Sequence, residues 1–310
     1  MRSKHIEQLS CEDVLCRLKN NIHMKKTINC HAKINLSLDV TGRREDGYHL
    51  VEMVMQSLDL CDELSMEILH GEKGTILLET DLEGLETDER NLACRAVKAL
   101  MDRFDINDGV KMHLTKKIPM AAGLAGGSSD CAGALKRAHE LFGLGLDNKQ
   151  LMEVGVSLGA DVPYCVMGGT ALAQGIGEVL TPLSAMPNCG ILLAKPDISI
   201  ATGPVYKAID SMPSYPHPDT KGIIAAIDRG DLEGICGCMM NVLELVTGEN
   251  HPMIGRLENQ MMEQGAIGAM MSGSGPTVFG IFENLEKAEI AGDAIRKSGF
   301  TGFVSAHKPV

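Results

Sequence analysis

The sequence lacks a run of 18 apolar residues and lacks the apolar stretch of a signal peptide. We therefore expect neither membrane insertion nor export. It also lacks an excess of basic residues, since 29 Lys and Arg stand against 41 Asp and Glu and the formal charge is −12. Nucleic acids and anionic membranes need basic surfaces, so neither is expected as a partner. A polyanionic small molecule would have to bind at a local positive site.

The ten cysteines lack the paired spacing of an extracellular disulfide framework. They are scattered through apparent core segments, which favours reduced thiols and a cytoplasmic protein. Cys236 and Cys238 form the one close pair, and they lack the second ligand pair of a zinc site. We therefore expect no metal site in the protein itself.

A chain of 310 residues, 44% of them hydrophobic, is long enough for two domains or one large one. We expect an N-terminal extension over 1–26, a first domain over 27–184 and a second over 185–310. Residues 1–23 are polar, and Met24 is a possible natural start. The expected state is a monomer or weak homodimer.

Strand and helix patterns mix without a regular βαβ repeat, which predicts an α+β fold. Strands are expected at 27–40, 49–69, 75–79, 110–115, 163–174, 190–195, 266–271 and 277–282, and helices at 91–104, 131–142, 148–158, 220–228, 231–245, 252–264 and 285–298.

The segment between strand 110–115 and helix 131–142 reads KKIPMAAGLAGGSSDC and is rich in small residues. Its glycines allow positive φ angles and close approach by a ligand. Ser128, Ser129 and Asp130 stand where an N-cap belongs. A helix start adds free N–H groups and a positive dipole end, so the segment is a candidate anion cradle. The alternative is a flexible connection between strand and helix.

The loop is neither a Walker A motif nor a G-x-G-x-x-G fingerprint. Pro119–Ser129 instead resembles the phosphate loop of the GHMP small-molecule kinases, and Ala32–Leu36 and Met271–Pro276 resemble two further motifs of that family. Thr41–Leu50 and Gly159–Pro163 resemble one branch, whose substrate is a cytidine diphosphate-linked methylerythritol. The departures are Ala121, Ala122 and Ala125, where the branch has more glycine.

The resemblance implies an N-terminal domain like ribosomal protein S5 domain 2, a ferredoxin-like C-terminal domain and an active site between them. It implies ATP as phosphate donor, with Mg²⁺ held mainly by ATP. The ATP-binding residues that it implies are Lys116, Pro119, Met120, Ala121, Ala122, Gly123, Leu124, Ala125, Gly126, Gly127, Ser128 and Ser129.

By the same resemblance, Asp161 is the general base that takes the proton of the substrate hydroxyl, and Lys33 is its partner. Asn35, on the same strand face as Lys33, matches a substrate-binding Asn. Local sequence alone favours an ordinary turn residue at Asp161, and it fits Asn35 equally well as an ordinary strand residue. A nucleotide-binding regulator without catalysis would be expected to lack Lys33 or Asp161, and both are present.

Tyr48 and His49 follow Gly47 in the branch-specific motif. A ring that stacks on a pyrimidine and an imidazole that reads its edge are what cytosine recognition needs. The alternative is a turn His with no ligand. A GHMP kinase for another alcohol, such as homoserine or mevalonate, is the rival hypothesis that this motif opposes.

Overall fold

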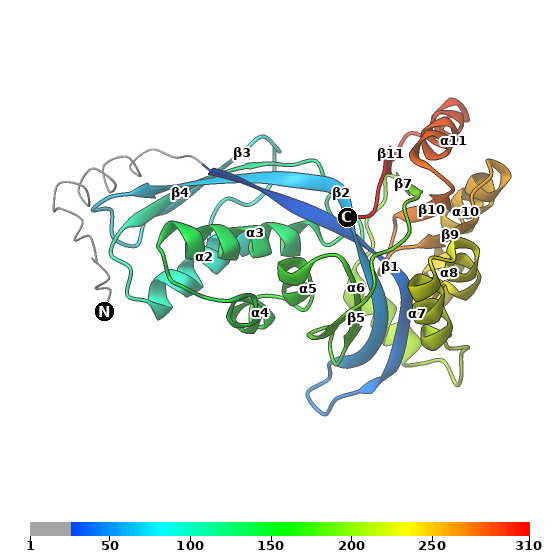
Figure 1. The fold of residues 1–310 in the computed structure, drawn as a ribbon, viewed down its shortest axis with the longest axis horizontal. Helices are drawn as coiled ribbons and strands as arrows, with labels where there is room; N and C mark the ends of the chain where they lie inside the picture. The colour runs from blue at the N-terminus through cyan, green and yellow to red at the C-terminus, as the bar shows by residue number, and fades with distance from the viewer. Residues whose placement is uncertain (1–25) are drawn as a thin grey trace, which may run out of the picture.

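The structure is a computed structural model that describes residues 26–310. It contains two β-sheets, one of seven strands and one of four. The long strands β1 (Lys26–Arg43) and β2 (His49–Leu69) run from the part of the molecule covered by α2–α4 to the part that holds the second sheet (Figure 1). Helices and mixed sheets alternate irregularly, so the expected α+β class is confirmed.

The seven-stranded sheet has the order β3-β4-β2-β1-β8, with β5 paired to β2 and β6 paired to β5. Its pairs are antiparallel except for β3–β4 and β1–β8. The remaining strands of this sheet are β3 (Ile76–Thr80), β4 (Gly109–Thr115), β5 (Thr170–Gln174), β6 (Val179–Pro182) and β8 (Met240–Asn241).

Helices cover one face of this sheet because each buries an apolar stripe. In α2 (Leu92–Arg103), Asn91 caps the N-terminus by accepting from the backbone N–H of Ala93 at 2.9 Å. Helix α3 (Gly126–Leu141) packs against β1 and β2, and α5 packs against α3. The other helices of this half are α4 (Asn148–Val156) and α5 (Val162–Met167).

The four-stranded sheet has the order β11-β7-β10-β9 and is antiparallel throughout. Its central strand β7 is apolar on both faces because both faces are covered. Helix α11 packs on β7 and β11, and α10 packs on β9 and β10. This half contains β7 (Gly190–Lys195), β9 (Gly268–Met271), β10 (Val278–Phe282), β11 (Phe303–His307), α6 (Thr202–Ile209), α7 (Thr220–Arg229), α8 (Leu232–Cys238), α9 (Glu244–Asn250), α10 (Met253–Glu263) and α11 (Leu285–Lys297).

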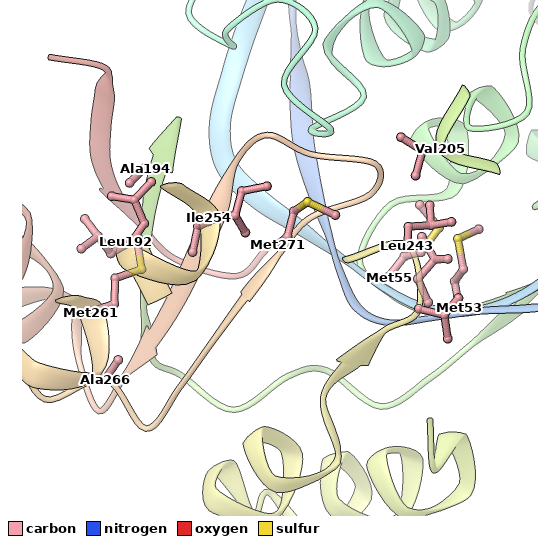
Figure 2. Packing of buried hydrophobic residues seen from close by; sticks show 14 of the residues in the cluster. Met53, Met55, Leu192, Ala194, Val205, Leu243, Ile254, Met261, Ala266 and Met271 are labelled. Carbon is pink, nitrogen blue, oxygen red and sulfur yellow. The ribbon is translucent and has the colours of Figure 1, made fainter. Parts of the chain in front are cut away.

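One buried apolar cluster joins the two sheets. Met53 and Met55 enter it from β2, whereas Leu192 and Met271 enter it from the second sheet (Figure 2). Burial of this kind contributes about 25 cal/mol per Å² of apolar surface. The cluster therefore holds the two halves in a defined relation, which matters because the candidate site is lined by residues from both.

Several sequence expectations differ from the structure. Residues 162–167 form helix α5 rather than strand, because Pro163 sits in the first turn, where its missing N–H costs nothing. The helix expected over 231–245 is α8, the short strand β8 and the start of α9, since β8 pairs with β1. Helix α6 was not predicted. Within residues 26–310, none of the helices is both long and apolar enough to cross a membrane.

Candidate active site

Two irregularities in the β1–β2 pairing set the direction of a buried polar pair. The register shifts between His31 and Lys33 and again between Asn35 and Ser37. Lys33 and Asn35 are both buried, and the Lys33 ammonium donates to Asn35 Oδ1 at 2.8 Å and to the Gly123 carbonyl at 3.1 Å. A buried ammonium needs such acceptors. Strand β1 thus points a cation at Gly123, within the phosphate loop.

Helix α3 begins at Gly126, earlier than the sequence predicted. Its N-cap is Ala125, in the left-handed region at φ 57°, and no side chain of residues 26–310 caps the helix. The expected capping by Ser128, Ser129 or Asp130 is therefore wrong, because all three lie inside the first turns. Of the loop glycines, Gly123 has a positive φ, whereas Gly126 and Gly127 are helical. The first N–H groups of α3 are left free for a ligand.

Gly123 is the point where the phosphate loop meets the segment Ser272–Gly275. It has φ +73°, and a Cβ there would collide with the Ser272 carbonyl. The Ser272 hydroxyl in turn donates to the Gly123 carbonyl at 3.0 Å. The positive φ and the lack of space for a Cβ both require glycine at this position. The three motifs quoted from the sequence thus meet at Gly123, through the Lys33 ammonium on one side and Ser272 on the other.

Asp161 precedes helix α5, and its carboxylate caps no backbone group. Asp161 Oδ2 lies 3.9 Å from Lys33 Nζ. The side chain of Asp161 is 33% exposed, whereas that of Lys33 is 5% exposed. A carboxylate that does not bond its own turn is free to face a ligand. Burial of Lys33 strengthens its attraction for anions near this point.

Lys116 is not a free counter-charge for a phosphate. Its buried ammonium pairs with Asp62 and with Asp130, the latter at 2.6 Å. Burial opposes charge on Lys116, yet the two carboxylates outweigh it and raise the pKa of Lys116. Burial raises the pKa of Asp130 to about 7 against the pull of Lys116, and Asp130 Oδ1 has no hydrogen-bond partner within residues 26–310. Lys117 pairs with Glu63 at the surface.

These elements surround one cavity of about 1000 Å³. It is large enough for two substrates together. Lys33, Asp161, Asn35, Tyr48 and His49 all line it. The expected ATP-binding residues that line it are Lys116, Pro119, Met120, Ala121, Ala122, Gly123, Ala125, Gly126, Gly127 and Ser128. Leu124 and Ser129 do not: Leu124 is buried, and the Ser129 hydroxyl donates to the His31 carbonyl at 2.7 Å.

At the other end of the cavity lie Tyr48 and His49. Tyr48 is 59% exposed as a residue, whereas the side chain of His49 is only 14% exposed. His49 lies against the Tyr206 ring, with centroids 4.9 Å apart, and its Nε2 is 2.7 Å from Asp210 Oδ1. Sequence reasoning missed Tyr206 and Asp210, because helix α6 carries no motif and only the fold brings it beside β2.

Two family models match the chain. The model described as GHMP kinases N terminal domain matches residues 91–169, which hold the phosphate loop and Asp161. The model described as GHMP kinases C terminal matches residues 223–300, which hold the Ser272–Gly275 segment.

The chain is also similar to curated relatives over most of its length. It is 48% identical to a 4-diphosphocytidyl-2-C-methyl-D-erythritol kinase of Alkaliphilus metalliredigens, over 85% of this chain and 90% of that protein. It is 43% identical to the protein of that name from Clostridium botulinum, over 89% of this chain and 97% of that protein.

Among solved structures, a 4-(cytidine 5'-diphospho)-2C-methyl-D-erythritol kinase superposes with a TM-score of 0.77 at 31% identity, over 92% of this chain and 99% of that one. A homoserine kinase from Cytophaga hutchinsonii superposes with a TM-score of 0.73 at 20% identity, which shows the shared fold. The chain therefore belongs to the GHMP kinases, in the 4-diphosphocytidyl-2-C-methyl-D-erythritol kinase family.

Proposed function

We propose that the chain transfers the γ-phosphoryl group of ATP to the 2-hydroxyl of 4-diphosphocytidyl-2-C-methyl-D-erythritol, giving the 2-phosphate and ADP in the non-mevalonate isoprenoid pathway. The observation that carries this proposal is the position of the Lys33–Asp161 pair, in one cavity with an open helix N-terminus and with an aromatic and imidazole pair. Phosphoryl transfer depends mainly on positioning and counter-charge, which this arrangement supplies.

In this proposal Asp161 accepts the proton of the substrate hydroxyl as that oxygen attacks phosphorus. Lys33 then stabilises negative charge on the reacting oxygens, while Asn35 and the Gly123 carbonyl hold its ammonium in place. The N–H groups at the start of α3 receive the phosphates. Tyr48 stacks on the cytosine ring, and His49 reads its edge.

Mg²⁺ is proposed to enter with ATP and to neutralise phosphate charge. The carboxylates of Asp62 and Asp130 are both paired with Lys116. Ser128 and Asp161 line the cavity beside the loop, and a hydroxyl and a carboxylate are oxygen ligands that suit a hard cation. This small number of protein ligands is consistent with a metal ion that is held mainly by ATP. We further propose a cytoplasmic monomer or weak homodimer that binds no nucleic acid.

The test is identification of the product. Wild-type protein is incubated with ATP, Mg²⁺ and the cytidyl alcohol, and phosphorus NMR with mass spectrometry should show ADP and a new phosphomonoester on the 2-oxygen. Asp161→Asn serves as the matched control and should give little product. Hydrolysis of ATP without transfer to the alcohol would contradict the proposal.

A further inference from the structure

Asp210 joins two groups of the first sheet at the base-binding end of the cavity. It lies just after helix α6, and its Oδ1 is 2.7 Å from His49 Nε2. Its Oδ2 accepts from Arg43 Nη1 at 3.1 Å. His49 and Arg43 pair with each other across the β1–β2 turn. One carboxylate from the second half of the chain thus orients two side chains of the first half.

The contact with Asp210 determines which nitrogen of His49 carries hydrogen. An ionised carboxylate only accepts hydrogen bonds, so Nε2 must be the donor. In a neutral imidazole Nδ1 is then an unprotonated acceptor. Within residues 26–310, Nδ1 has no hydrogen-bond partner, and His49 lines the cavity. The free acceptor of His49 is therefore available to a ligand.

Arg43 keeps this arrangement in one orientation. Its guanidinium has only donors, and it occupies Oδ2 of Asp210 while its Nε donates to the Gly47 carbonyl at 3.2 Å. The carboxylate is therefore held by a donor at each oxygen. Substituting the carboxylate by an amide would leave Arg43 facing the amide oxygen, because Arg43 cannot accept.

We propose that Asp210 is a positioning residue that makes the site select cytosine over uracil by fixing the tautomer of His49. This inference rests on the proposed function. Cytosine carries an amino donor at position 4 of the ring, whereas uracil carries a carbonyl acceptor there. An unprotonated Nδ1 accepts a hydrogen bond from the amino group and leaves the carbonyl unpaired. A buried polar group without a partner is what gives such sites their discrimination.

The decisive variant is Asp210→Asn, which keeps the shape of the side chain. With the amide oxygen facing Arg43, the amide NH₂ faces His49 and requires Nε2 to accept. The imidazole hydrogen then moves to Nδ1, which becomes a donor. The ratio of kcat/KM for the cytidyl substrate to that for its uridyl analogue should fall roughly tenfold or more.

Nitrogen-15 NMR of the free enzyme, with labelled histidine in mildly alkaline buffer, reads the tautomer without any substrate. Wild type should show the hydrogen on Nε2 of His49, and Asp210→Asn should show it on Nδ1. In the double variant Arg43→Met with Asp210→Asn, the amide is free to turn its oxygen to His49, so both the tautomer and the ratio should return toward wild type. Asp46→Asn changes the same charge at the cavity without a hydrogen bond to His49, and its ratio should stay at the wild-type value.

A wild-type His49 with hydrogen on Nδ1, or an Asp210→Asn enzyme with an unchanged substrate ratio, would overturn the role of Asp210 while leaving the kinase activity intact. Failure of the wild type to phosphorylate either nucleotide-linked alcohol would overturn the proposed function itself. The NMR result separates the two cases, because it does not depend on turnover.

Discussion

The two ends of the cavity differ in the groups that line them: one is lined mainly by backbone and the other mainly by side chains. At the proposed phosphate end the lining is mainly backbone, with the left-handed Ala125 and the first N–H groups of α3, and the neighbouring Lys116 and Asp130 are paired with each other. At the base end the lining comes from side chains that meet across the fold. A phosphate needs many similar donors around it, which backbone supplies, whereas a base is distinguished by its edge, which requires particular side chains.

The largest expected effect lies between the two ends, at Asp161. Asp161→Asn should reduce kcat roughly 10²-fold or more, the usual scale for a general base, while both substrates still bind. Lys33→Ala should also lower kcat, and the double variant should cost less than the sum because the two residues act together. Steady-state kinetics on folded variants measures this. A near-normal kcat for Asp161→Asn would remove it from the role.

At the phosphate end, Gly127→Val should weaken the binding of ATP and leave the binding of the cytidyl substrate unchanged. Among the described residues, a Cβ at Gly127 has only Leu92 within 4 Å, so the fold tolerates it, but the branched side chain crowds the N–H groups of α3. Losing one charge-assisted hydrogen bond of ~1.5–3 kcal/mol predicts at least a roughly tenfold rise in KM for ATP.

Gly237→Val is the matched control, because Gly237 is a helical glycine with open space on α8 and does not line the cavity. An equal rise in KM for the cytidyl substrate would show that the two ends are not separate.

At the base end, Tyr48→Ala should have the opposite selectivity. Stacking is worth ~1–3 kcal/mol per base, so kcat/KM for the cytidyl substrate should fall about tenfold while KM for ATP stays near wild type. Leu77→Ala removes another exposed apolar side chain, away from the cavity, and should change neither constant. An unchanged kcat/KM in Tyr48→Ala would argue against stacking.

The smallest expected effect is on stability, and it tests the burial of Asp130 beside the phosphate end. Because the pKa of Asp130 is raised from 3.8 to about 7, the folded protein binds a proton that the unfolded chain releases between these values. The unfolding free energy should therefore fall as pH rises from about 4 to about 7. In Asp130→Asn, the fall in unfolding free energy over this pH range should be smaller than in wild type by about 1 kcal/mol or more. Denaturant titrations across this range test it, and parallel pH profiles would contradict it.

Much of the phosphate end could be predicted from sequence, because its residues are close together in the chain. The strand pattern, the glycines and the following apolar stripe located the loop, and the alternation of β1 placed Lys33 and Asn35 on one face. The helix start was misjudged, since it depends on a left-handed alanine that no capping rule anticipates.

The base end was only half visible in the sequence. Tyr48 and His49 lie in a recognisable motif, but Arg43 and Asp210 gain meaning only when α6 is placed beside the β1–β2 turn. That contact spans 161 residues between His49 and Asp210, and α6 itself was not predicted. Partners brought together by tertiary packing leave no local pattern to recognise.

The most direct test of the account is a comparison of alcohol acceptors under one ADP-release assay. The wild type should use the cytidyl-linked alcohol far better than homoserine, mevalonate or the same alcohol without its nucleotide, because only the first engages both ends of the cavity. Comparable kcat/KM for the acceptor without a nucleotide would show that the base end does not bind the substrate, and would contradict the account.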